Sequence, residues 1–387
     1  MPRNDDLRRI DSELTLIVDM FNITNACLNY CSHCLSKATK NGGHLKFSHI
    51  EPLLDSDRLL FGYEYNGREL QRGKKGTSTT LSVGDPLEYD SEGKNVGEVA
   101  RLMHKKFSYF DESVFRCILK EFKNKTYTQL ETYARLHSTY THTTSILTAV
   151  IMPDDKFKRS VIGNLAEIKE MVQMTLSINL YRLRPKTGFG IEEYKRALEY
   201  TVELLAPFNP DFNVRFDNSN KDETFQLAGE ITGKKIIDTL EASRSGNNED
   251  EGIIARQITR AGWARCFSEN RFDETGINRN NVQRAMGYER PYVDINGDYS
   301  ITLANCDLHG PEGIFIGDVR THSSEDVIQE LQTFKEIMLR KLEEAGPAAK
   351  GRSNNIYYEN LKEIRGEMQA AREKRGFVPS KNPILKV

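Results

Sequence analysis

Three of the six cysteines of this chain lie within one short stretch, as Cys27, Cys31 and Cys34. The spacing is C-x3-C-x2-C, and a flexible loop of this length can wrap three thiolates around one metal centre. Three thiolates are one ligand short of a closed structural zinc site, so the fourth position stays open for another ligand. Residues 14–24, which precede the cysteines, are mostly apolar and partly β-branched, as in a buried strand. We therefore expect the thiols on a loop at the C-terminal end of that strand, where α/β barrels build their chemistry.

This stretch resembles the cysteine loop of the radical SAM superfamily. In that family, a C-x3-C-x2-C loop after the first barrel strand holds a four-iron four-sulfur cluster. Three irons take cysteine thiolates, and the fourth takes the amino and carboxylate groups of S-adenosylmethionine (SAM). The resemblance implies that Cys27, Cys31 and Cys34 are the cluster ligands. The family usually has an aromatic residue before the third cysteine, in contact with the adenine. Here His33 takes that position, a mild departure from the pattern, and the resemblance implies that it binds SAM.

A second motif follows the cysteines at the distance that the family shows. Residues 79–87 are predicted to form a short strand that ends in a tight turn of sequence SVGDP. This turn resembles the family's Gly-Gly-Glu-Pro type motif, whose backbone hydrogen-bonds the methionine amino group of SAM. Valine replaces one glycine here, and aspartate replaces the glutamate. The resemblance implies that Gly84, Asp85 and Pro86 bind the cofactor, with Gly84 bringing the backbone close and Pro86 fixing the turn.

Two polar residues, Ser177 and Asn179, alternate with apolar neighbours on a strand predicted at 175–183. Alternation places both on one face of the strand. Related radical SAM enzymes use polar strand residues to hold the SAM ribose and carboxylate. The resemblance therefore implies a cofactor-binding role for both, although no diagnostic spacing accompanies them.

The C-terminal part resembles the SPASM or twitch extension of radical SAM enzymes that modify peptides. The likeness lies in the order of Cys266, a hairpin at 292–303 with an Asn-Gly turn, Cys306 and a strand at 313–319. Those extensions carry more cysteines for auxiliary clusters, and two are too few for a cysteine-ligated cluster. We interpret the module as a cluster-free relative. Either cysteine could donate a thiol hydrogen in an epimerisation; a buried or paired structural cysteine is the simpler interpretation of each alone.

Predicted strands alternate with predicted helices through residue 217, which favours a parallel sheet with helical crossovers. Strands are expected at 14–24, 79–87, 143–152, 175–183 and 212–216, and helices at 47–60, 96–106, 111–135, 160–173 and 191–205. The family resemblance implies an α/β fold, a partial (β/α)6 TIM-like barrel followed by a small α+β module; the number of strands stays open. We divide the chain into a barrel at 1–230, a SPASM-like module at 231–330 and a helical tail at 331–387.

Composition narrows the class of protein. Of 387 residues, 38% are hydrophobic and 28% charged, and the net charge is −2. These values are typical of a globular protein without the basic surface that nucleic acid requires. The charged N-terminus lacks the apolar core of a signal peptide, and no apolar run approaches membrane-spanning length. We expect a cytoplasmic protein with no membrane or nucleic-acid partner, where clustered cysteines bind metal or act in catalysis rather than form disulfides.

The resemblance implies an enzyme in which a reduced cluster cleaves SAM to methionine and a 5′-deoxyadenosyl radical, which takes a hydrogen atom from the substrate. A reductase, flavodoxin or ferredoxin is the implied electron donor. The SPASM-like module favours a peptide substrate. The polar lead-in at 1–13 is too short for a leader-binding domain and fits a small metabolite, sugar or nucleotide instead. The alternatives of another class are a non-catalytic protein that holds zinc through the cysteines with His33 or His44, and a cluster-binding scaffold.

Overall fold

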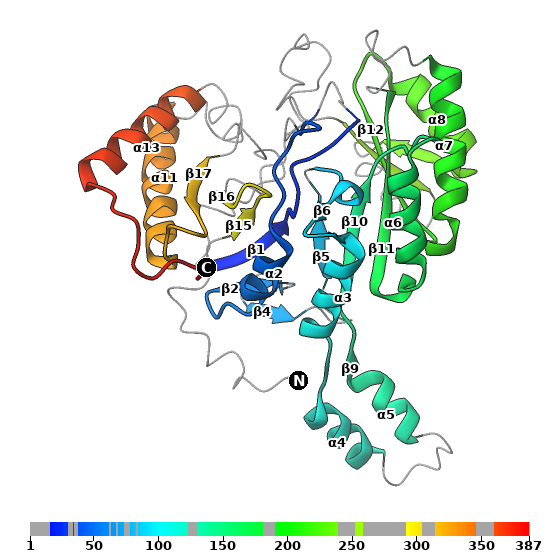
Figure 1. Ribbon diagram of the computed structural model, residues 1–387, viewed down its shortest axis with the longest axis horizontal. Helices are drawn as coiled ribbons and strands as arrows, with labels where there is room; N and C mark the ends of the chain where they lie inside the picture. The colour runs from blue at the N-terminus through cyan, green and yellow to red at the C-terminus, as the bar shows by residue number, and fades with distance from the viewer. Residues whose placement is uncertain are drawn as a thin grey trace.

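A computed structural model describes most of the chain (Figure 1). The described residues are 16–29, 34, 38–61, 63–66, 69–72, 78–82, 84–122, 130–180, 190–238, 252–257, 292–303, 314–345 and 360–386. Within these ranges, eleven strands form one mostly parallel sheet with helices packed along it, so the fold is α/β. No helix in the described part of the chain is long and apolar enough to cross a membrane.

Six parallel strands are neighbours in the sheet in the same order as in the chain. They are β1 (Leu16–Phe21), β5 (Ser78–Leu81), β10 (Thr143–Thr148), β11 (Val172–Ile178), β12 (Asp211–Phe216) and β14 (Ile253–Gln257). A seventh, β13 (Ile236–Asp238), lies parallel at the edge beyond β14. Parallel neighbours require a crossover between them, and the chain uses helices for most of these connections.

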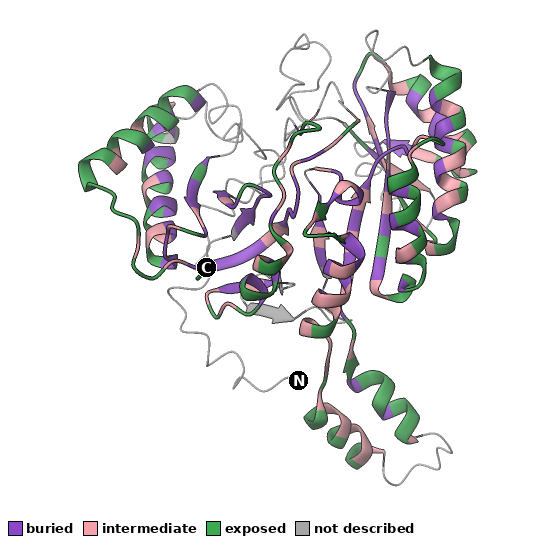
Figure 2. Cartoon of the chain, viewed as in Figure 1, coloured by how far each residue is buried: buried purple, intermediate pink, exposed green. Residues whose placement is uncertain are grey.

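The crossover helices pack along the sheet. They are α2 (Phe47–Leu54), α3 (Val96–Phe107), α6 (Lys156–Ala166), α7 (Ile191–Leu205) and α8 (Lys221–Thr232). Figure 1 shows α6, α7 and α8 side by side along β10, β11 and β12. Side chains on β10 and β11 alternate, so that Ile146, Met174 and Leu176 are fully buried while their neighbours are partly exposed. Figure 2 shows the core as the buried faces of these strands and helices.

The C-terminal strands extend the sheet on the other side of β1. β15 (Tyr292–Ile295) pairs parallel with β1, and β16 (Ser300–Leu303) and β17 (Phe315–Asp318) follow antiparallel. The hairpin predicted around the Asn-Gly turn is therefore confirmed. Helix α11 (Ser324–Glu344) packs on β17, and α13 (Leu361–Arg375) packs on α11. One sheet thus contains strands from both the first and the second predicted segment.

A helical hairpin projects from the rest of the molecule (Figure 1). Strands β8 (Tyr109–Phe110) and β9 (Thr139–Tyr140) carry α4 (Glu112–Glu121) and α5 (Leu130–Ser138), which pack on each other. The helical segment predicted at 111–135 is therefore two helices. The apolar spacing of this segment predicts Cys117 in the core, but the residue is exposed, since α4 has no buried residue.

The remaining strands are short. β2 (Leu59–Phe61) pairs with β1, β3 (Tyr63–Asn66) with β4 (Glu69–Arg72), and β6 (Asp90–Ser91) with β7 (Lys94–Asn95). The β3–β4 pair is the hairpin that the Asn-Gly dipeptide at 66–67 predicts. The polar stretch 218–262 contains α8, β13 and β14, elements that its composition does not reveal.

Candidate functional site

The chain that leads from β1 to the cysteines is held by backbone contacts. Thr24 forms an antiparallel bridge with His44, and Ala26 forms a parallel bridge with Thr39. The Cys27 N–H donates to the carbonyl oxygen of Thr39 at 3.0 Å. Two successive bridges fix the direction of the chain as it enters the cysteine segment, residues 24–34. Cys27 therefore follows a strand end, as the sequence predicts.

Glycines from three distant parts of the chain surround this backbone. A Cβ atom added to Gly42 would lie 2.1 Å from the Asn25 carbonyl oxygen, and one added to Gly84 would lie 2.4 Å from the Thr24 carbonyl oxygen. At Gly297 it would lie 2.8 Å from the Asn25 nitrogen. Real Cβ atoms do not approach backbone this closely, so only glycine fits at these positions. Three glycines thus form a cradle around residues 24–26.

Two of the three predicted cluster ligands fall within the described residues. Cys27 and Cys34 are both half-buried. Cys31, the middle thiol, and His33 lie outside the described residues. Among the residues that the structure describes, no three His, Cys, Asp or Glu side chains gather as a metal-ligand group. That finding does not include the middle thiol of the proposed set.

The turn predicted to bind SAM lies directly against the cysteine segment. After β5, the Asp85 N–H donates to the carbonyl oxygen of Ala26 at 2.8 Å. Pro86 begins a short 3-10 helix, Pro86–Glu88, which Asp85 caps by accepting from the Leu87 N–H at 3.2 Å. Residues 84–88, called the 84–88 turn below, therefore join the cysteine segment through backbone and side chain. The structure brings the two sequence motifs together.

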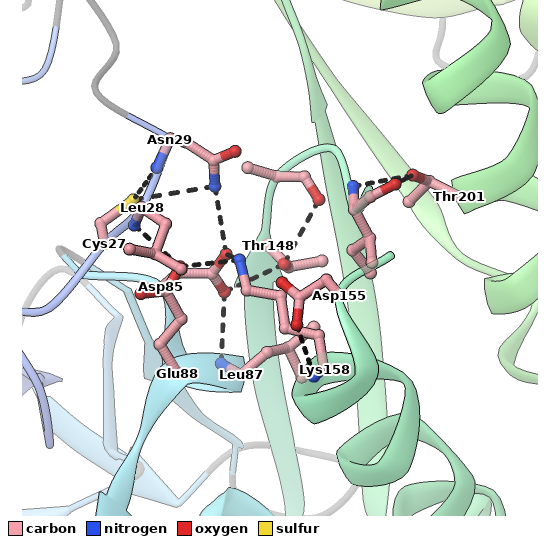
Figure 3. A network of polar contacts seen from close by, with 12 residues as sticks. Cys27, Leu28, Asn29, Asp85, Leu87, Glu88, Thr148, Asp155, Lys158 and Thr201 are labelled. Carbon is pink, nitrogen blue, oxygen red and sulfur yellow. Dashed lines mark hydrogen bonds and ion pairs between the residues drawn. The ribbon is translucent and has the colours of Figure 1, made fainter. Parts of the chain in front are cut away.

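A buried ion-pair network lies behind this turn (Figure 3). The Lys158 Nζ atom is 2.7 Å from Asp85 Oδ2 and 2.8 Å from Glu88 Oε1, and the three side chains are 3%, 2% and 9% exposed, respectively. Thr148 at the end of β10 donates its hydroxyl to Asp85 Oδ1 at 3.0 Å. Glu88 Oε1 also accepts the backbone N–H of Leu28 at 2.8 Å. The network therefore links β10 and α6 to the cysteine segment.

Asn29 connects the network to a cysteine sulfur. Its side-chain amide donates to Asp85 Oδ2 at 3.3 Å and lies 3.7 Å from Cys27 Sγ, and its backbone N–H donates to the same sulfur at 3.4 Å. N–H donors directed at a sulfur stabilise its negative charge, and in iron–sulfur proteins such bonds help set the reduction potential. Cys27 thus has surroundings suited to a ligating thiolate.

Burial and charge act against each other in this network. Burial raises the pKa of the Glu88 carboxyl above its ordinary value, and the Lys158 ammonium limits the rise. Burial alone would lower the pKa of Lys158, but the charges of Asp85 and Glu88 outweigh it and raise that pKa. Lys158 therefore stays protonated at physiological pH, and its ammonium compensates part of the charge of the two buried carboxylates.

Ser177 and Asn179 lie at the C-terminal end of β11, separated from β5 by β10. The Asn179 side-chain amide donates to the Ser177 hydroxyl at 3.4 Å, and its backbone N–H donates to the Tyr194 hydroxyl on α7. Asn179 is fully buried, and its Oδ1 atom has no hydrogen-bond partner among the residues that the structure describes. A buried acceptor without a partner is uncommon in proteins and fits a donor that a ligand would bring.

Polar side chains line the sheet face that points away from the crossover helices. Ser145 pairs in register with Thr80, and Ser177 with Asn213; all four are half-buried, as is Thr175. Each alternates with residues buried in the core, so alternation places the polar set on the opposite face. This row of hydroxyl and amide groups can form hydrogen bonds with a polar ligand.

Sequence reasoning missed the residues that join the two motifs. The sequence patterns assign no role to Lys158, Glu88 or Asn29. The position of Lys158, however, is a sequence signal for a buried ion pair. It falls at helical spacing with Val161 and Leu165 on the apolar stripe of α6, where a lysine needs a buried partner. Cys266 and Cys306, the candidate hydrogen donors, lie outside the described residues.

Neither comparison with known proteins finds a relative: no protein-family model matches the chain, and no curated protein is significantly similar to it.

Proposed function

We propose that this protein is a radical SAM enzyme. The observation that carries the proposal is the contact between its two motifs. The Asp85 N–H donates to Ala26, directly before Cys27, and Gly84 lies against the backbone of Thr24. A cysteine loop and a glycine-containing turn, each after one of two neighbouring parallel strands, fit a site that holds both a cluster and its SAM ligand. A zinc knuckle requires no such second segment.

The strand order supports a partial (β/α)6 TIM-like barrel as the finer description of the fold. The six strands β1, β5, β10, β11, β12 and β14 are parallel neighbours in chain order, as in an α/β barrel. In that arrangement the C-terminal strand ends form the functional face, and both motifs follow such ends. On this proposal the barrel extends from residue 1 through β14, beyond the boundary predicted at residue 230, and the SPASM-like module up to residue 330 and the helical tail at 331–387 follow it.

The residues present fit a four-iron four-sulfur cluster. The chain offers three closely spaced thiols, and the sulfur of Cys27 accepts N–H donors from Asn29. Cys27, Cys31 and Cys34 would hold the cluster. With SAM bound, it would supply the electron that cleaves the sulfonium and yields a 5′-deoxyadenosyl radical able to abstract a substrate hydrogen.

The chain's own residues would hold and orient SAM and the substrate. The 84–88 turn would present backbone groups to the methionine amino group. Ser177 and Asn179 would bind the ribose or carboxylate, and the unpartnered Oδ1 atom of Asn179 offers an acceptor for this. His33 would contact the adenine. The polar row on the same sheet face would orient the substrate, because its hydroxyls and amides are half-exposed.

We propose a peptide as the substrate, with a reductase, flavodoxin or ferredoxin as the electron donor. The support is the position of the C-terminal hairpin, whose turn at Gly297 lies against the cysteine segment. A peptide-handling extension would therefore adjoin the reacting centre. A small metabolite, sugar or nucleotide is the alternative substrate. Cys266 or Cys306 would act as a hydrogen donor if the reaction is an epimerisation.

The test is anaerobic reconstitution of the full chain with iron and sulfide, followed by dithionite and SAM, with 5′-deoxyadenosine quantified. We expect a four-iron cluster and product formation that ends when Cys27, Cys31 and Cys34 are all changed to alanine. Cys117→Ala is the matched control, because Cys117 is exposed on the projecting helix α4. It should leave cluster and product unchanged.

Two outcomes would contradict the enzyme proposal. If the reconstituted protein binds zinc and assembles no cluster, the cysteines form a structural zinc site and the protein is non-catalytic. An assembled cluster that yields no 5′-deoxyadenosine, with or without candidate peptides, would favour a scaffold. A panel of peptides and small metabolites added to the same assay separates the two substrate classes, because a bound substrate increases the rate of SAM cleavage only when it matches the site.

A further inference from the structure

Lys158 occupies a position that is unfavourable for a cation by itself. It lies in the first turn of α6, whose N-terminus is capped by Asp155 accepting from the Lys158 N–H at 3.0 Å. The helix dipole disfavours a positive charge at this end, and burial disfavours it further. Val161 and Leu165 on the same stripe are fully buried, so an apolar side chain would suit the position. The lysine is therefore explained by what its ammonium contacts.

Both of its carboxylate partners also contact the cysteine segment. Glu88 Oε1 accepts from Lys158 and from the backbone N–H of Leu28, each at 2.8 Å (Figure 3). Asp85 Oδ2 accepts from Lys158 at 2.7 Å and from the Asn29 amide at 3.3 Å. The same oxygen atoms thus contact the ammonium on one side and the two residues after Cys27 on the other. Among the described residues, no hydrogen bond or ion pair joins Lys158 directly to the cysteine segment.

We propose that Lys158 is a positioning residue for the cluster loop, an inference that rests on the radical SAM proposal. Two buried carboxylates this close repel each other, and the ammonium between them holds both in place. Glu88 and Asp85 in turn fix Leu28 and Asn29, and Asn29 directs its N–H groups at Cys27 Sγ. A chain of direct contacts therefore runs from α6 to a ligating sulfur.

The first arm of the test uses the metal-free protein. The alkylation rate of Cys27 by iodoacetamide is followed by mass spectrometry of its peptide. We expect Lys158→Met to accelerate it about 5- to 30-fold, because the loop opens more often. Lys156→Met, an exposed lysine on the same helix, should match the wild type. The alkylation rate of Cys27 in Lys158→Arg should be closer to the wild-type rate than the rate in Lys158→Met is.

The second arm uses the reconstituted protein. Iron loss to a chelator should be about 10- to 100-fold faster in Lys158→Met, the usual loss when an outer contact of a metal ligand is removed. The midpoint potential of the cluster should also shift, since the N–H donors to Cys27 would move. A purely structural lysine would lower the thermal midpoint and leave both the potential and the alkylation rate of the folded protein unchanged.

The outcomes separate the two proposals. A wild-type chain that assembles no cluster contradicts the radical SAM function, and the alkylation arm still reports whether Lys158 holds the loop. A normal cluster in the wild type, with wild-type alkylation and potential in folded Lys158→Met, overturns the positioning role. If Lys158→Met fails to fold by circular dichroism, Glu88→Ala carries the test, because it removes the acceptor for Leu28 and leaves Lys158 paired with its second carboxylate, Asp85. Wild-type alkylation in that variant would likewise overturn the proposal.

Discussion

The buried carboxylate of Glu88 gives the site a specific pH dependence. Burial raises the pKa of Glu88 above its ordinary value of 4.5, so the folded protein holds this proton more tightly than the unfolded chain does. The stabilisation from the protonated form is complete below pH 4.5 and is lost as the pH rises through the raised pKa. Glu88→Gln removes this group. We therefore expect the free energy of unfolding of the wild type, relative to Glu88→Gln, to fall across that window.

Urea unfolding of both proteins between about pH 4 and pH 8 measures the difference. Above the raised pKa the two curves should run parallel. Curves that are parallel over the whole range would show that the Glu88 pKa is ordinary and that the network is more solvated than the structure indicates.

Gly84 gives a second prediction for a single residue. Gly84→Ala would place a Cβ atom 2.4 Å from the Thr24 carbonyl oxygen, so either the turn or the cysteine segment must move. We expect a loss of about 1–3 kcal/mol in the free energy of unfolding, as for other overpacked sites, together with a lower iron content after reconstitution. The control is Gly163→Ala on α6, where a Cβ meets nothing within 4 Å. That change should stabilise by about 1 kcal/mol through helix propensity.

The sequence alone identifies part of this site. Cys27, Gly84 and Asp85 are recognisable because their spacing and turn chemistry are local properties. Lys158 is not, because a lysine on an apolar stripe indicates a buried partner without indicating which one. That partner, Asp85, lies 73 residues earlier in the chain. Ion pairs of this kind depend on which strands become neighbours, and one sequence does not encode that in any local pattern.

Among the secondary-structure elements, the hairpin β15–β16 has the least expected role. Its strands form as the Asn-Gly turn predicts, and its turn then contacts the cysteine segment. The Gly297 N–H donates to the Asn25 side chain at 3.3 Å, and a Cβ at this position would lie 2.9 Å from Thr24 Cα. The C-terminal module therefore supplies one side of the cradle around the loop.

Gly297→Ala tests this contribution. We expect the added methyl group to push the hairpin turn from the cysteine segment, lowering cluster retention and destabilising the fold by about 1–3 kcal/mol. Gly366→Ala on α13 is the matched control, since a Cβ there meets nothing within 4 Å. Iron content and urea unfolding measure both effects. Equal iron retention in the two variants would mean that the hairpin does not hold the loop.

Elements with strong local signals are predicted well, and those defined by their neighbours are not. The helix at 191–205 has the predicted bounds, because its apolar spacing runs unbroken from end to end. Strands β13 and β14 escape detection because they are short and lie within a polar stretch. The segment at 111–135 contains two helices because the apolar period does not reveal where a helical chain reverses.

At the scale of the whole molecule, strand β1 near the start of the chain pairs with strand β15 of the C-terminal module. The Asn22 side-chain amide donates to Asn296 Oδ1 at 3.2 Å, and the Met20 N–H donates to Asp294 at 3.2 Å, in each case across 274 residues. Parallel pairing of β15 with β1 is a long-range contact that hydrophobic patterns do not specify, which is why the sequence predicts both strands but not their pairing. The strand that leads to the cysteines is thus central because the C-terminal module covers one side of it.

This arrangement predicts that the first 290 residues do not form a working cluster site by themselves. Removing residues 291–387 would leave β1 as an edge strand with unpaired backbone groups on the side where β15 lies, and would remove Gly297 from the cradle. We expect the shortened chain to aggregate or to retain far less iron than the full chain. Size-exclusion chromatography and iron content measure this, and a chain ending at residue 345, which keeps β15 to β17 and α11, is the control. A shortened chain of 290 residues that is monomeric and holds the full cluster would show that the loop is organised by the first six parallel strands alone.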